Sequence, residues 1–192
     1  MRLRSENAAY EGPLVLLEVR VPIATGAEQK AGEQLGKARF AAYGKTMYPD
    51  ATFTLRLSYG QVKGYPMNGT IAPPKTTLYG LYDRADSFNL EGPFALPARY
   101  KEGRDKLDLT TPLDFANTCD SVGGSSGSPV VNKNGELVGI NFDRNVEGLG
   151  RAYVYQEETG RAIAVHSSAI VEALRKMYGA SKLADELQGR AN

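Results

Sequence analysis

Cysteine, histidine and tryptophan are scarce in this sequence of 192 residues, which holds one cysteine, one histidine and no tryptophan. The single cysteine, Cys119, excludes an internal disulfide and a thiolate metal cluster, because both need several cysteines. Free cysteines are usually interior residues, so we expect Cys119 to be buried. Nothing in the sequence implies a metal ion or an organic cofactor.

Long apolar runs and blocks of one charge are also missing. Apolar stretches such as Leu14–Leu17 fall far short of the roughly 20 residues that a membrane helix needs, so we expect no membrane span. Residues 1–12 carry Glu6 and Glu11 where a secretory leader would be apolar, and no export signal is expected in this chain. The net charge is +1 and the two signs alternate, which argues against nucleic-acid binding.

The first half of the chain combines a helical pattern with a strand pattern. Small and apolar residues recur at helical spacing over 26–43, which predicts an amphipathic helix ending at Gly44. Apolar and polar residues alternate over 52–59, which predicts a half-buried strand. Prolines and glycines over 66–106 predict a long, partly ordered connection. Two short helices are predicted within it, at 77–85 and 98–107.

The second half is typical of short antiparallel strands separated by glycine, asparagine and aspartate. The predicted strands cover 113–117, 129–132, 137–142, 152–155 and 161–165. The pair Asn134-Gly135 accepts the positive φ of a tight turn and predicts a hairpin. Ser167 or Ser168 is expected to cap a closing helix that ends at Gly179. This pattern predicts a mainly β fold, a small barrel or sandwich with flanking helices.

A dense cluster of glycine and serine stands between two of these strands. Residues Gly124–Pro129 read Gly-Ser-Ser-Gly-Ser-Pro and resemble the nucleophile loop of chymotrypsin-like peptidases. Glycines let the backbone bend so that the N–H groups of Gly124 and Ser126 converge on a developing oxyanion, while Ser126 presents its hydroxyl. Ser126 is therefore the candidate nucleophile.

Two other interpretations of this cluster stay open. Glycine and serine also make ordinary turns between strands. An α/β-hydrolase elbow is the second alternative, but it would need a glycine at Ser128 and a helix where Pro129–Val131 begins a strand.

Several segments resemble the end of the bacterial serine dipeptidyl-peptidases of the type 7 and type 11 kind. They are Tyr48–Leu57, Gly64–Tyr65, Thr111–Phe115, Asp120–Val130 and Gly139–Asn145. The resemblance implies a chymotrypsin-like double barrel with an added helical domain, and the release of dipeptides from a free amino end. On this basis residues 1–48 would end the helical domain, and residues 49–192 would form a six-stranded C-terminal barrel with its closing helix.

The resemblance also implies a set of substrate contacts. Asp143 would anchor the α-ammonium group of the substrate, and Phe142 belongs to the same substrate-binding set. Arg144 falls at the determinant of primary specificity. Arginine there implies an acidic second residue, closest to the type 11 enzymes, since its planar fork binds a carboxylate through two hydrogen bonds. A functionally silent surface ion pair between Asp143 and Arg144 is the alternative.

The base that would activate Ser126 is missing from this sequence. A serine hydroxyl needs such a base, normally histidine oriented by aspartate, and the family resemblance implies that both lie far upstream of the serine. The only histidine, His166, follows a predicted strand and precedes the last helix, so we expect a helix-capping or surface role for it. The sequence thus predicts the C-terminal part of a longer enzyme, inactive alone.

Two functions are compatible with these features. One is a serine dipeptidyl-peptidase that forms an acyl-enzyme, with a peptide bearing a free amino end and an upstream segment carrying His and Asp as its partners. The other is a catalytically inactive barrel that binds peptides. The resemblance implies a periplasmic or cell-surface location in a bacterium, and it is compatible with a homodimer of the full-length enzyme.

Overall fold

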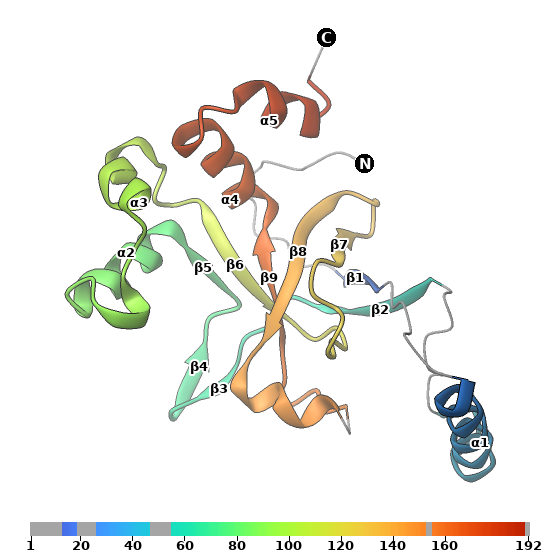
Figure 1. The fold of residues 1–192 in the computed structure, drawn as a ribbon. Coiled ribbons are helices and arrows are strands. Elements are labelled where there is room, and N and C mark those ends of the chain that lie inside the picture. The colour runs from blue at the N-terminus through green and yellow to red at the C-terminus, as the bar shows by residue number, and fades with distance from the viewer. Residues whose placement is uncertain (1–12, 19–25, 47–54, 153–154, 191–192) are drawn as a thin grey trace.

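The structure is a computed structural model that describes residues 13–18, 26–46, 55–152 and 155–190. Seven strands form one antiparallel sheet in the order β2-β1-β7-β8-β9-β6-β5, which lies at the centre of the molecule in Figure 1. These strands are β1 (Pro13–Glu18), β2 (Arg56–Gln61), β5 (Lys75–Thr77), β6 (Pro112–Asn117), β7 (Pro129–Asn132), β8 (Leu137–Arg144) and β9 (Ala162–His166). A separate two-stranded sheet pairs β3 (Tyr65–Met67) with β4 (Thr70–Ala72).

Helices α2 to α5 flank the large sheet, whereas α1 stands apart from it (Figure 1). The α-helices are α1 (Gly26–Tyr43), α2 (Leu78–Ser87), α3 (Ala98–Gly103), α4 (Ser167–Glu172) and α5 (Ser181–Leu187). The 3₁₀ helices are η1 (Gly44–Thr46), η2 (Gly92–Phe94), η3 (Arg104–Lys106) and η4 (Val146–Ala152), and η5 (Ala173–Met177) is a π-helix. Antiparallel strands with flanking helices are thus present as predicted, but the fold is a mixture of helix and sheet and not mainly β. The domain boundary near residue 48 stays a prediction.

Hydrogen bonds tie together two segments that stand near opposite ends of the strand order. Directly after β2, Lys63 N–H donates to Ala116 O at 3.1 Å, and at the end of β6 Thr118 N–H donates to Gln61 O at 2.9 Å. Gly60 is required at this junction, because a Cβ there would lie 2.6 Å from Cys119 N. The sheet therefore curls until the chain after β2 meets β6.

A buried apolar core links these strands. Its members are Phe115, Cys119, Val130, Val138 and Ala164. Cys119 is 0% exposed, which confirms the prediction that the lone cysteine is interior. The hairpin between β7 and β8 is also confirmed, since Gly135 has φ +77° and its N–H donates to Asn132 O at 2.9 Å.

Strand β2 turns its apolar residues outward. It overlaps the strand predicted at 52–59, of which residues 52–54 lie outside the described part. The side chains of Leu57 and Tyr59 are 60% and 82% exposed. The predicted half-buried strand is present, but the covered face is not the apolar one, because the face with small residues packs on the chain after β6. There Asp120 N–H donates to Ser58 Oγ at 2.7 Å.

Helix α1 occupies the predicted residues 26–43, and Gly44 follows it with φ +59°. All of its described side chains are exposed, and the helix stands apart from the sheet in Figure 1. The helix itself is confirmed, whereas the apolar face expected for an amphipathic helix is not covered by any of the described residues.

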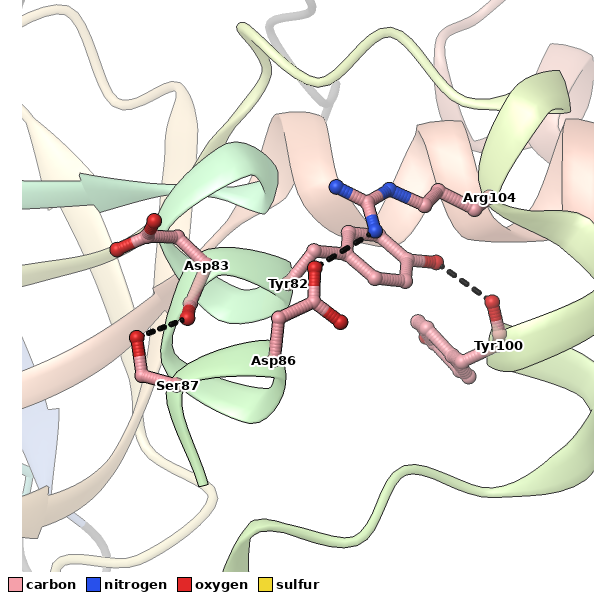
Figure 2. A network of polar contacts seen from close by, with 6 residues as sticks. All are labelled: Tyr82, Asp83, Asp86, Ser87, Tyr100 and Arg104. Atoms are coloured by element: carbon pink, nitrogen blue, oxygen red, sulfur yellow. Dashed lines mark hydrogen bonds and ion pairs between the residues drawn. The ribbon is translucent and has the colours of Figure 1, made fainter. Parts of the chain in front are cut away.

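The stretch 66–106 is well structured, which corrects the prediction of a partly ordered connection. It contains β4, β5, α2 and α3, and the two helices confirm those predicted at 77–85 and 98–107. Figure 2 shows how α2 and α3 are joined: the Tyr82 hydroxyl donates to Tyr100 O at 2.8 Å. Arg104 lies over the Tyr82 ring and pairs with Asp86 at 2.8 Å. Polar contacts of this kind do not follow a regular spacing along the sequence, so the order of this stretch could not be predicted from it.

The strand predicted at 152–155 is wrong in its described residues. Ala152 ends the short helix η4, Tyr155 lies outside any strand, and residues 153–154 are outside the described part. The hydroxyl of Tyr155 donates instead to Thr118 O at 2.9 Å. Among the described residues of this segment, Tyr155 is therefore held by its side chain and not by strand pairing.

The loop before β9 is anchored by Arg161, which is 1% exposed. Its guanidinium donates to Lys63 O at 3.0 Å and to Gly64 O at 2.8 Å. It also donates to Glu157 O and Gly160 O, both at 2.6 Å. Burial, and to a lesser extent the charge of Arg151, lowers the pKa of Arg161. A single buried cation thus joins the chain before β3 to the chain before β9.

Replacing Arg161 with methionine is expected to lower the free energy of unfolding by about 3 kcal/mol or more, because several buried carbonyls lose their donor. Arg104→Met is the matched control. Arg104 and Asp86 are 40% and 47% exposed, and such ion pairs contribute at most about 1 kcal/mol. Urea unfolding measures both variants, and equal losses would contradict the anchoring role of Arg161.

Candidate active site

The cluster of glycine and serine forms an irregular, non-helical loop between β6 and β7. Gly124 and Gly127 have φ of +99° and +88°, values that glycine adopts without a steric penalty. Between them Ser126 is exposed, and its Oγ donates to the carbonyl oxygen of Phe142 at 3.2 Å. The loop therefore presents a serine hydroxyl at the surface, beside the end of β8.

Two backbone N–H groups at this bend are free to bind an anion. Within the described part of the chain, neither Gly124 N–H nor Ser126 N–H donates a hydrogen bond. Their neighbours are engaged, since Ser125 N–H donates to Val122 O at 3.0 Å and Gly127 N–H donates to a β8 carbonyl at 2.7 Å. Unpaired amide donors beside a serine hydroxyl are what an oxyanion site requires.

The chain leading into the loop is held by Arg151, which is 3% exposed. Its Nη1 donates to Cys119 O at 3.1 Å and its Nη2 to Thr118 O at 3.2 Å. Arg151 was not among the residues expected at the site. No sequence pattern marks it, because a long side chain that binds carbonyls needs no particular spacing.

A bulge in β8 shapes the other side of the site. Opposite β9, Asn141 pairs with Ala164 and Asp143 pairs with Ile163, so Phe142 is an extra residue in the ladder. Bulges bend a strand and redirect the side chains that follow. Phe142 is 46% exposed, and its carbonyl is the group that accepts the bond from the serine loop.

Asp143 and Arg144 lie directly after this bulge and do not form the surface ion pair that was the alternative interpretation. Asp143 Oδ1 accepts a hydrogen bond from the backbone N–H of Arg144 at 2.8 Å. Arg144 Nη1 is buried and has no hydrogen-bond partner among the described residues. Leaving such a donor unpaired costs about 1–3 kcal/mol, so this guanidinium is suited to bind a carboxylate.

His166 is committed to the fold. Its Nδ1 accepts a hydrogen bond from Ser168 N–H at 3.1 Å and caps α4, which confirms the predicted capping role and corrects the expectation that Ser167 or Ser168 is the cap. Burial, and then the charge of Lys75, lowers the pKa of His166 to about 4. A histidine of this pKa with its Nδ1 occupied is a weak proton acceptor for Ser126.

Among the residues that the structure describes, no three His, Cys, Asp or Glu side chains gather in a way that would hold a metal ion. No described helix is both long and apolar enough to span a membrane.

Relatives of known activity align with most of this chain. An Asp/Glu-specific dipeptidyl-peptidase of Porphyromonas gingivalis is 38% identical over 149 residues, which are 73% of this chain and 20% of that protein. A dipeptidyl-peptidase 7 of Phocaeicola vulgatus is 39% identical over 148 residues, 72% of this chain and 20% of the relative. An Asp/Glu-specific dipeptidyl-peptidase of Porphyromonas endodontalis is 34% identical over 194 residues, 97% of this chain and 25% of its own length.

The fold is similar to a solved structure, that of Porphyromonas endodontalis DPP11 in complex with the dipeptide Arg-Glu. The TM-score is 0.67 at 31% sequence identity, over 79% of this chain and 23% of that one. The chain spans 20% to 25% of the length of the curated relatives described above. The family model described as Peptidase S46 matches residues 18–189, and the chain therefore belongs to the peptidase S46 family.

Proposed function

We propose that this chain supplies the nucleophile of a serine dipeptidyl-peptidase and acts together with a segment that carries the histidine and aspartate of the triad. The observation that supports this most is the exposed Ser126 hydroxyl at a glycine-bounded bend, beside the unpaired N–H groups of Gly124 and Ser126. The relatives named as dipeptidyl-peptidases support the activity. Because this chain covers a quarter or less of their length, the remaining triad residues are proposed to come from the rest of the enzyme.

In the proposed reaction the base takes the proton of the Ser126 hydroxyl, which is donated to Phe142 O in this structure. The Oγ attacks the carbonyl carbon of the second substrate residue, and the N–H groups of Gly124 and Ser126 donate to the oxygen that gains negative charge. The peptide bond then breaks, and the shortened peptide leaves as an amine with the proton from the base. Water hydrolyses the dipeptidyl ester on Ser126, and the Oγ recovers its proton.

The end of β8 supports a preference for an acidic second residue. Sequence identity does not choose between the two kinds of relative, since it is 38% to an Asp/Glu-specific enzyme and 39% to a dipeptidyl-peptidase 7. Arg144 favours the first kind, because its partly buried guanidinium has a donor without a partner among the described residues. The exposed carboxylate of Asp143, one residue earlier, is proposed to bind the substrate's ammonium group.

The architecture proposed for this enzyme is chymotrypsin-like. The strands β2, β1, β7, β8, β9 and β6 would form the six-stranded barrel. Because β1 lies within residues 1–48, only the later part of that range, with α1, would end a helical domain. The bonds that join Gln61 and Lys63 to the β6 end support this arrangement. A periplasmic or cell-surface location is proposed from the family resemblance.

The complete enzyme is needed for a test. A joined enzyme can be prepared by fusing this chain to the part of the Porphyromonas endodontalis relative that precedes the matched region. We expect it to release dipeptides with glutamate second from a peptide with a free amino end. Acetylation of that end should slow cleavage by about 100-fold or more, because Asp143 loses its cationic partner. Mass spectrometry of the products measures both rates.

Equal rates on the free and acetylated peptides would contradict the proposed dipeptidyl-peptidase activity. Binding of the peptide with no release of any dipeptide, in a joined enzyme that folds, would favour the peptide-binding module instead.

A further inference from the structure

The geometry points to Asn141 as the residue that positions the oxyanion-binding amide of Ser126, an inference that rests on the proposed function. Asn141 lies in β8 and is 1% exposed. Its Nδ2 donates to Ser121 Oγ at 3.0 Å and to Ser125 O at 3.3 Å. One carboxamide thus binds both the start of the loop and the residue that precedes the candidate nucleophile.

The backbone of Asn141 holds the other side of the same bend. Its carbonyl accepts from Gly127 N–H at 2.7 Å, and its N–H donates to Ser128 O at 2.9 Å. The loop is therefore fixed on both sides of Ser126 by a single residue of the sheet. Asn141 bonds neither the hydroxyl nor the N–H of Ser126: the hydroxyl donates to Phe142 O, and the N–H stays available to an oxyanion.

The bond to Ser125 O determines where the Ser126 N–H points. These two groups belong to one peptide unit, the described chain contains no cis peptide bond, and C=O and N–H point in opposite directions across a trans peptide. Because Asn141, with Ser128 N–H at 3.1 Å, holds the Ser125 oxygen, the Ser126 N–H is directed away from the Asn141 carboxamide. If this peptide plane rotated, the Ser126 N–H would point away from the oxyanion, and only the Gly124 N–H of the two proposed donors would remain.

Asn141 acts through its donors. Both of its side-chain bonds run from Nδ2, and its Oδ1 is buried without a partner among the described residues. Aspartate has the same shape but, when ionised, only accepts hydrogen bonds. In Asn141→Asp the carboxylate would face the Ser125 oxygen without a proton between them and favour rotation of that peptide. Protonation of the carboxyl would restore one donor.

The test compares wild type with Asn141→Asp in the joined enzyme. We expect kcat to fall on the order of 100-fold, the effect of losing one oxyanion donor, while KM and the affinity for the product dipeptide change less than about threefold. A dipeptide aldehyde, whose hemiacetal oxygen would occupy the oxyanion site, should lose affinity in the same proportion as kcat. The deficit relative to wild type should shrink as the pH is lowered from about 8 to about 5, because burial at position 141 raises the pKa of an aspartate and the carboxyl then regains a proton in this range.

Asn132→Asp is the matched control. Asn132 is 2% exposed in the adjacent β7, and its Oδ1 accepts from Asn134 N–H at 2.9 Å in the hairpin away from the loop. This variant should lower the melting temperature without changing the ratio of aldehyde to product affinity. Ser121→Ala is a milder second test, since it removes only the hydroxyl that Asn141 binds, and it should shift the same ratio in the same direction.

The positioning role of Asn141 would be wrong if Asn141→Asp and Ser121→Ala both left the ratio of aldehyde to product affinity unchanged. If Ser126→Ala were inactive in the same experiment, the proposed function would still stand. An equal shift in Asn132→Asp would also overturn the positioning role, because the effect would then be general destabilisation. Full activity of Ser126→Ala would overturn the proposed function, and this inference with it.

Discussion

Replacing Ser126 with alanine is expected to slow dipeptide release by the joined enzyme on the order of 10⁵-fold, because the variant lacks the atom that forms the acyl-enzyme. Ser126 is exposed at a bend whose shape depends on its neighbouring glycines, so the fold should be unaffected. Release of dipeptides from a glutamate-containing peptide measures the rate. Labelling by a fluorophosphonate, which reacts with an activated serine, should disappear in the same variant.

Ser87→Ala is the control for this prediction. Ser87 is also exposed, and its Oγ donates only within α2, to Asp83 O at 2.8 Å (Figure 2). This variant should keep full activity and labelling. If Ser126→Ala retained the wild-type rate, the proposed serine mechanism would be wrong, whatever the fold.

Replacing Arg144 with glycine is expected to lower kcat/KM for a peptide with glutamate second by about 100-fold. The physical reason is that a desolvated carboxylate loses a charge-assisted, two-point partner. Peptides with leucine second should be affected little or cleaved faster, because the unpaired guanidinium no longer faces them. The measurement is the ratio of kcat/KM for two peptides that differ only in this residue.

Arg144→Lys separates the charge from the geometry. Lysine keeps the positive charge but lacks the planar fork, so its preference for glutamate should fall between those of wild type and the glycine variant. An unchanged preference in Arg144→Gly would remove Arg144 from the specificity site and leave Asp143 and Ser126 in their proposed roles.

The sequence was most informative where a local rule determines the backbone. Gly124 and Gly127 adopt the positive φ that their loop requires, and the Asn134-Gly135 turn joins the two strands expected around it. The helix at 26–43 was predicted at its observed residues for the same reason, since helical spacing and a terminal glycine are local signals. The exposure of the Ser126 side chain follows from the bend that those two glycines allow.

Features that depend on distant partners could not be predicted. The outward face of β2 follows from Ser58 and Gly60 packing on the chain after β6, a contact that alternation alone does not reveal. The support of the candidate active-site loop comes from Arg151 and Asn141, which bind carbonyl oxygens remote in sequence. A capping role for His166 could be expected from its place between a strand and a helix, but the sequence did not distinguish it from the two serines that follow.

The extra residue in β8 has a consequence for how specificity can diverge in evolution. Side chains alternate between the two faces of a strand, so a one-residue shift exchanges them. Because Phe142 offsets the ladder against β9, loss or gain of a codon beside it would send Asp143 and Arg144 to the wrong faces together. Point substitution at position 144 leaves that register intact. In the proposed enzyme, exchange of the side chain at position 144 would therefore change the preference for the second substrate residue, while a change in the length of β8 would displace Asp143 as well.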